Sequence, residues 1–105
     1  MITKFLSDSE QDIEISAEIL RNGGLVAFPT ETVYGLGGNA LSPSASQAIY
    51  AAKGRPSDNP LIVHIADTAS VYELASEVPE VAKTLMEAFW PGPLTIILPK
   101  ADIVP

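Results

Sequence analysis

Apolar residues along this chain recur at helical spacing in some segments and form short continuous runs in others. The first segment predicts an amphipathic helix with Ile13, Ala17 and Leu20 on its inner face, because these residues are three or four positions apart. Ser7 followed by Glu10 has the spacing of a capping box, in which each side chain bonds the backbone N–H of the other residue. We therefore expect a helix that begins just after Ser7.

Short apolar runs predict strands at 25–28, 33–39, 61–65 and 94–98. The second of these is rich in glycine, with three glycines within residues 35–38. Glycine inside a strand often marks a close approach of another backbone or of a ligand. We expect such an approach here.

A second helix is predicted after Ser42, because the next residue, Pro43, is of the type favoured at the first helical position. Ala45 and Ile49 belong to its expected inner stripe, four positions apart. This helix is expected to end just before a cluster of cationic residues.

One or two helical turns are predicted at 68–75, and a further helix after Pro79, with Val81, Leu85 and Phe89 as its inner face. The predicted order is helix, strand, strand, helix, strand, two helices and strand. Alternation of this kind indicates an α/β layered domain with a twisted mixed sheet and flanking helices.

Composition narrows the class of protein. The 105 residues suffice for a single domain, and the absence of cysteine excludes disulfides, a thiolate nucleophile and cysteine metal ligands. The net charge of −7, with only six cationic residues, disfavours general binding to nucleic-acid backbone. No apolar run approaches the roughly 20 residues that span a bilayer, and the first residues do not resemble a signal peptide. We expect a cytoplasmic protein without a membrane partner.

Two polar clusters carry the candidate chemistry. Residues 24–36 place two threonines and a carboxylate directly after an apolar strand, as the rim of a small-molecule pocket requires. Residues 53–60 bring Lys53, Arg55 and Asn59 together in one loop, a local positive spot that suits a phosphate-bearing ligand. The chain has no P-loop pattern, so an ATP site would use a different phosphate cradle.

Four motifs in this order resemble the YrdC-type threonylcarbamoyl-AMP synthases. They are Phe-Pro-Thr-Glu-Thr-Val-Tyr-Gly-Leu at 28–36, Lys-Gly-Arg-Pro at 53–56, Pro-Leu-Ile-Val-His at 60–64 and Trp-Pro-Gly-Pro-Leu-Thr at 90–95. The resemblance implies a YrdC-like fold, of which residues 1–105 would be the N-terminal portion of a single domain. The family's domain is longer, so the resemblance also implies a fragment that is inactive alone.

The resemblance implies an activity and a set of reactants. Members of the family are nucleotidyltransferases, which combine L-threonine, bicarbonate and ATP into threonylcarbamoyl-AMP and release pyrophosphate. This product feeds downstream tRNA-modifying proteins that make threonylcarbamoyladenosine. ATP would enter as a substrate, accompanied by Mg²⁺ shared between phosphates and water. The chain itself has no zinc-ligand spacing, so no protein metal site is expected.

The resemblance also assigns residues. Thr32 and His64 match positions that contact L-threonine, and Arg55 and Asn59 match positions that contact ATP. Lys53 and Arg55 are the expected catalytic pair, since cations stabilise charge that develops during acyl and adenylyl transfer.

Each of these residues also has a simpler structural interpretation. Lys53 and Arg55 at a helix end could only complement the helix dipole, and His64 could be a hydrogen-bonded core histidine. Glu31 is expected to cap or brace its turn rather than act as a base.

Two other functions stay open. One is a double-stranded RNA-binding module, which the acidic charge disfavours. The other is a paralogue of the same fold with a different carbamoyl- or acyl-adenylate chemistry.

Overall fold

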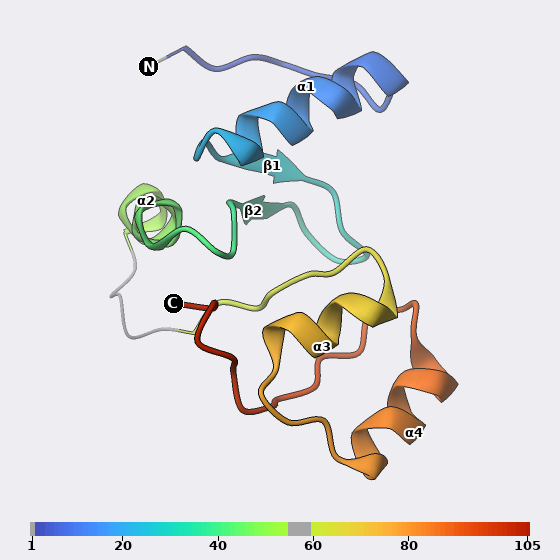
Figure 1. The fold of residues 1–105 in the computed structure, drawn as a ribbon. Helices are drawn as coiled ribbons and strands as arrows, with labels where there is room; N and C mark the ends of the chain where they lie inside the picture. The colour runs from blue at the N-terminus through green and yellow to red at the C-terminus, as the bar shows by residue number, and fades with distance from the viewer. Residues whose placement is uncertain (1, 55–59) are drawn as a thin grey trace. The chain divides into compact units, whose positions relative to one another are not determined.

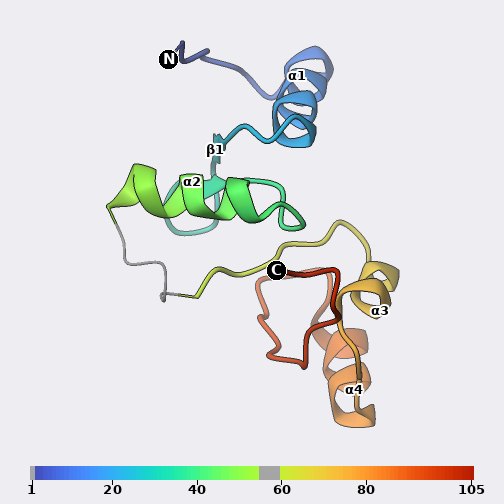
Figure 2. The same ribbon diagram turned by 60° about the vertical axis from the view of Figure 1, so that its left-hand side comes forward.

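The structure, a computed structural model, describes residues 2–54 and 60–105. Its contacts divide the chain into two compact units, one up to residue 59 and one from residue 60 onward. Each unit is described by itself (Figures 1 and 2). The expectation that both belong to a single domain stays a prediction.

The first unit opens with α1, Glu10–Arg21. Its N-cap is Ser9, whose hydroxyl accepts a hydrogen bond from the N–H of Asp12 at 3.2 Å. The predicted capping box of Ser7 and Glu10 is therefore wrong by two positions. Ser7 instead donates its N–H and its hydroxyl to the Asp12 carboxylate, at 2.7 and 2.8 Å. The expected inner face is also wrong in part, since Ile13 is exposed.

A short antiparallel hairpin follows, made of β1 (Val26–Phe28) and β2 (Gly35–Gly37). Phe28 pairs with Gly35, so residues 29–34 form the connecting loop (Figure 1). A Cβ atom on Gly37 would lie 2.8 Å from Cε1 of Phe28. The Phe28 ring of the partner strand makes the close approach at Gly35 and Gly37, and the side chains of Leu25, Ala45 and Ile49 make it at Gly38.

The helix α2, Pro43–Lys53, begins and ends as the sequence predicts. The Ser42 hydroxyl accepts a hydrogen bond from the N–H of Ala45 at 3.3 Å, and Pro43 occupies the first turn. Gly54 ends the helix at a φ of 66°, a left-handed conformation that glycine adopts without steric cost. Ala45 and Ile49 are buried, so the predicted inner stripe is confirmed at these positions.

The second unit contains a short 3-10 turn, η1 (Thr68–Ser70), and the helices α3 (Val71–Leu74) and α4 (Glu80–Phe89). Its core is Val71, Ala82 and Met86. Partly buried apolar residues pack around this core: Ile65, Ala75, Val78, Trp90, Ile96 and Leu98.

The predicted inner face of α4 is wrong. Val81 and Phe89 are 68% and 59% exposed, whereas Ala82 and Met86 are almost completely buried. The helix has two apolar faces, and periodicity alone does not say which one packs. The face with the small residue, Ala82, is the one that lies against α3 and the neighbouring segments.

The strands predicted at 61–65 and 94–98 do not form among the described residues. An apolar run becomes a strand only if a partner satisfies its backbone groups. In the second unit that pairing is limited to a bridge between Ala75 and Lys100, flanked by the bonds Ser76 N–H to Pro99 O (2.9 Å) and Ala101 N–H to Leu74 O (2.7 Å). The described sheet is therefore two-stranded and antiparallel. None of the described helices is long and apolar enough to cross a membrane.

Candidate functional site

The loop between β1 and β2 carries the first predicted site residue, Thr32. Every residue of this loop, 29–34, is exposed. The Thr32 backbone N–H donates to the hydroxyl oxygen of Thr30 at 3.3 Å. Among the described residues, the Thr32 hydroxyl itself has no hydrogen-bond partner. The hairpin therefore presents a hydroxyl that can still donate and accept.

Thr30 braces this loop. Its hydroxyl donates to the carbonyl oxygen of Val33 and also accepts the Thr32 N–H. The sequence predicts that Glu31 caps or braces this turn, but within the described part of the chain no hydrogen bond of the Glu31 carboxylate supports that prediction. The sequence contained a signal for this role of Thr30, because threonine hydroxyls often bond backbone groups two or three residues away.

Lys53 is the last residue of α2 and is exposed. Helix carbonyls point toward this end, so the ammonium group complements the negative end of the helix dipole. The same placement leaves the cation accessible to an anionic ligand. The other predicted cation, Arg55, and the predicted ATP contact Asn59 lie outside the described residues.

His64 belongs to the second unit and is exposed. Its Nδ1 lies 3.0 Å from the carbonyl oxygen of Ile62, which can only accept, so Nδ1 is the donor of this bond. In the neutral ring this tautomer leaves Nε2 unprotonated. Within its own unit His64 is not part of the core, because it is exposed.

Thr32 and Lys53 thus lie on different elements of the first unit, and His64 lies in the second. Each is exposed, and the structure defines each local geometry separately. Their assignment to one site stays a prediction.

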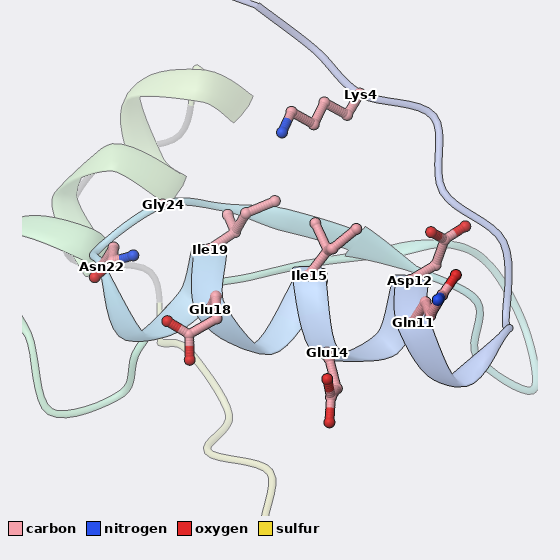
Figure 3. Close-up of a pocket in the computed structure, with 9 residues that line it drawn as sticks. All are labelled: Lys4, Gln11, Asp12, Glu14, Ile15, Glu18, Ile19, Asn22 and Gly24. Atoms are coloured by element: carbon pink, nitrogen blue, oxygen red, sulfur yellow. The ribbon is translucent and has the colours of Figure 1, made fainter.

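A hollow lies elsewhere, between the N-terminal segment and α1 (Figure 3). It has a volume of about 750 Å³ and lies beneath the extended segment that carries Lys4. Its lining residues come from this segment, from α1 and from the turn after α1: Lys4, Gln11, Asp12, Glu14, Ile15, Glu18, Ile19, Asn22 and Gly24. Figure 3 shows Lys4 above the helix, with the Glu14 side chain directed away from it.

This hollow contains none of the predicted site residues. The segment above it is tied down by the bonds from Ser7 to Asp12, and its Ile2 and Phe5 side chains are exposed. The hollow is therefore a gap beneath an extended segment, and we assign it no ligand. Across 2–54 and 60–105, histidine and carboxylate side chains form no group of three that could hold a metal ion.

Comparison with known proteins decides the family. A family described as telomere recombination, Sua5/YciO/YrdC, matches residues 18–105. The chain belongs to the Sua5/YciO/YrdC family. The predicted resemblance is thereby confirmed.

Two similar curated proteins carry the same name. The threonylcarbamoyl-AMP synthase of Pyrococcus abyssi is 58% identical over 96 residues, which cover 91% of this chain and 28% of that protein. The threonylcarbamoyl-AMP synthase of Bacillus subtilis is 58% identical over 98 residues, which cover 93% of this chain and 28% of that protein. This chain therefore spans little more than a quarter of the length of these relatives.

Solved structures confirm the α/β fold. A structure of Sua5 from P. abyssi matches with a TM-score of 0.89 and 58% identity, covering 92% of this chain and 30% of that one. A crystal structure of P. abyssi Sua5 complexed with L-threonine matches with a TM-score of 0.88, also at 58% identity, covering 92% of this chain and 28% of that one. The predicted fold, a truncated YrdC-like α/β fold, is confirmed at this level.

Proposed function

We propose that the protein carrying this chain is a threonylcarbamoyl-AMP synthase, a nucleotidyltransferase that joins L-threonine, bicarbonate and ATP and releases pyrophosphate. The observation that carries this proposal is the 58% identity to relatives of that name. A Sua5 structure complexed with L-threonine, which is also 58% identical, supports threonine as the amino-acid substrate.

Each predicted site residue has a role that follows from the chemistry of its side chain. The exposed Thr32 hydroxyl and His64 contact L-threonine, whose ammonium, carboxylate and hydroxyl groups need polar partners. Lys53 and Arg55 stabilise negative charge on bicarbonate, carbamate or phosphate. Arg55 and Asn59 contact ATP, since a guanidinium suits phosphate oxygens. Mg²⁺ accompanies the nucleotide, held by phosphates and water.

The product is an activated threonylcarbamoyl group for tRNA-modifying proteins, so we place the activity in the cytoplasm. The chain spans only about 28% of its relatives. We therefore propose that the 105 residues alone show no turnover, because further substrate contacts come from elsewhere in the whole protein.

Pyrophosphate release by the natural protein that carries this chain tests the proposal. We expect release that requires L-threonine, bicarbonate and ATP together, and no release when any one is omitted. Release that persists without threonine, or that another amino acid supports equally, would point to the paralogue with a different adenylate chemistry.

Double-stranded RNA binding is the weaker alternative. The net charge of −7 opposes a polyanion, because such binding depends on clustered cations and counterion release. A filter-binding titration with double-stranded RNA at low and high salt tests whether the protein has this RNA-binding function. RNA binding that weakens steeply with salt would support an RNA role, and absence of binding at low salt would end it.

A further inference from the structure

The Thr30 hydroxyl occupies a particular place in the β1–β2 loop. It accepts the backbone N–H of Thr32 at 3.3 Å and donates to the carbonyl oxygen of Val33. One hydroxyl therefore bonds the peptide group that precedes Thr32 and the peptide group that follows Val33. Together the two bonds restrain the stretch of backbone that carries the Thr32 side chain.

Little else holds this loop. Val33 and Tyr34 are 72% and 74% exposed, so apolar packing does not fix the backbone around Thr32. Among the described residues, the two bonds of Thr30 are the only side-chain hydrogen bonds to the loop backbone. The methyl group of Thr30 lies near the start of β2, since a Cβ added at Gly35 would be 3.6 Å from its Cγ2.

We propose that Thr30 is a positioning residue for L-threonine recognition, acting through Thr32. This inference rests on the proposed function, since it takes Thr32 as a threonine contact. A hydrogen bond weakens steeply as distance and angle depart from ideal, so a freed loop binds threonine less well. The predicted nucleotide contacts, Arg55 and Asn59, are distant from this loop in the sequence and should not depend on it. Thr30 therefore affects the amino-acid substrate and leaves ATP binding unchanged.

Steady-state kinetics on the natural protein that carries this chain test the proposal, with three variants. Thr30→Val keeps the shape and removes the hydroxyl. Thr30→Ser keeps the hydroxyl and removes the methyl group. Thr84→Val is the matched control, because the Thr84 hydroxyl also donates to a backbone carbonyl, that of Glu80 at 3.1 Å, but lies on α4.

For Thr30→Val we expect the KM for L-threonine to rise about tenfold, as for one hydrogen bond lost on binding, with the KM for ATP unchanged. Thr30→Ser should restore the KM for L-threonine to about twofold of the wild-type value, since the brace is remade. Thr84→Val should change neither constant.

The other outcomes are distinguishable. If the wild-type protein shows no threonine-dependent pyrophosphate release, the proposed function fails and the inference fails with it. If the wild type is active and Thr30→Val keeps its KM for L-threonine, only the role of Thr30 is overturned. Equal rises in both KM values, failure of Thr30→Val to fold, or a Thr30→Ser variant as impaired as Thr30→Val would each show a merely structural role and overturn the inference.

Discussion

Two turns in this molecule each contain a hydrogen bond from a side chain to a backbone carbonyl, but they differ in how far the surrounding residues are buried. In the loop 29–34, the Thr30 hydroxyl donates to the carbonyl of Val33. In the turn after α4, the Trp90 indole N–H donates to the carbonyl of Leu94 at 2.9 Å. Trp90 is also packed against the core of the second unit, whereas the loop residues are exposed.

This difference separates recognition from stability. A turn fastened by a half-buried aromatic contributes to the free energy of unfolding through burial and through its hydrogen bond. A turn fastened only by a small hydroxyl contributes little burial, and it leaves neighbouring polar groups accessible to a ligand. Substitutions in the second unit should therefore lower stability, and substitutions in the loop should lower threonine binding.

The largest expected effect is that of Met86→Ala. Met86 is 2% exposed in the core of the second unit, so truncation removes apolar contacts and leaves a cavity. We expect the free energy of unfolding to fall by about 2–5 kcal/mol, measured by denaturant titration of the natural protein. Val81→Ala on the exposed face of the same helix is the control and should change it by less than about 1 kcal/mol. Equal losses for the two variants would contradict the observed orientation of α4.

A smaller effect is expected for Trp90→Phe. The substitution keeps an aromatic ring against the core and removes the N–H that bonds Leu94. The free energy of unfolding should fall by about 1–2 kcal/mol, from the lost bond and the smaller ring. The KM for L-threonine should not change. A raised KM for L-threonine with an unchanged free energy of unfolding would contradict the claim that this turn serves stability and the loop 29–34 serves recognition.

The smallest effect concerns the N-terminal segment of the first unit. Hydrogen bonds from the Ser7 backbone N–H, and then from its hydroxyl, lower the pKa of Asp12 below its ordinary value of 3.8. A lowered folded-state pKa stabilises the folded protein above the unfolded-state pKa, and this contribution is lost as the pH falls through the folded-state pKa. Carboxyl NMR titration should therefore show Asp12 titrating below 3.8.

Ser7→Ala separates the two causes. It removes the hydroxyl bond and keeps the backbone bond, so the pKa of Asp12 should rise only part of the way to its ordinary value. An unchanged pKa would mean that the hydroxyl bond is not formed in solution.

Local signals in the sequence predicted the local parts of this fold. Ser42, Pro43 and Gly54 mark the ends of α2, because caps and helix breakers act on neighbouring residues. At α1 the same kind of signal was ambiguous, since Ser7 and Ser9 are both possible caps, and the structure uses Ser9.

The rest of the fold depends on partners distant in sequence. The apolar runs at 61–65 and 94–98 have strand composition, but pairing needs a neighbour that the sequence does not name. The face of α4 that packs could not be chosen from its periodicity, because both faces are apolar. In the candidate site, the family resemblance assigned Thr32, Lys53 and His64, and the structure finds each of them exposed, whereas the brace by Thr30 depends on loop geometry.

The most direct test of this account is calorimetric titration of L-threonine into the natural protein and into its Thr32→Val variant. The account predicts that the wild type binds L-threonine and that the variant binds it about tenfold more weakly, as expected for one lost hydrogen bond, with an unchanged melting temperature. Equal affinity of the two proteins for L-threonine would contradict the claim that this loop recognises the substrate.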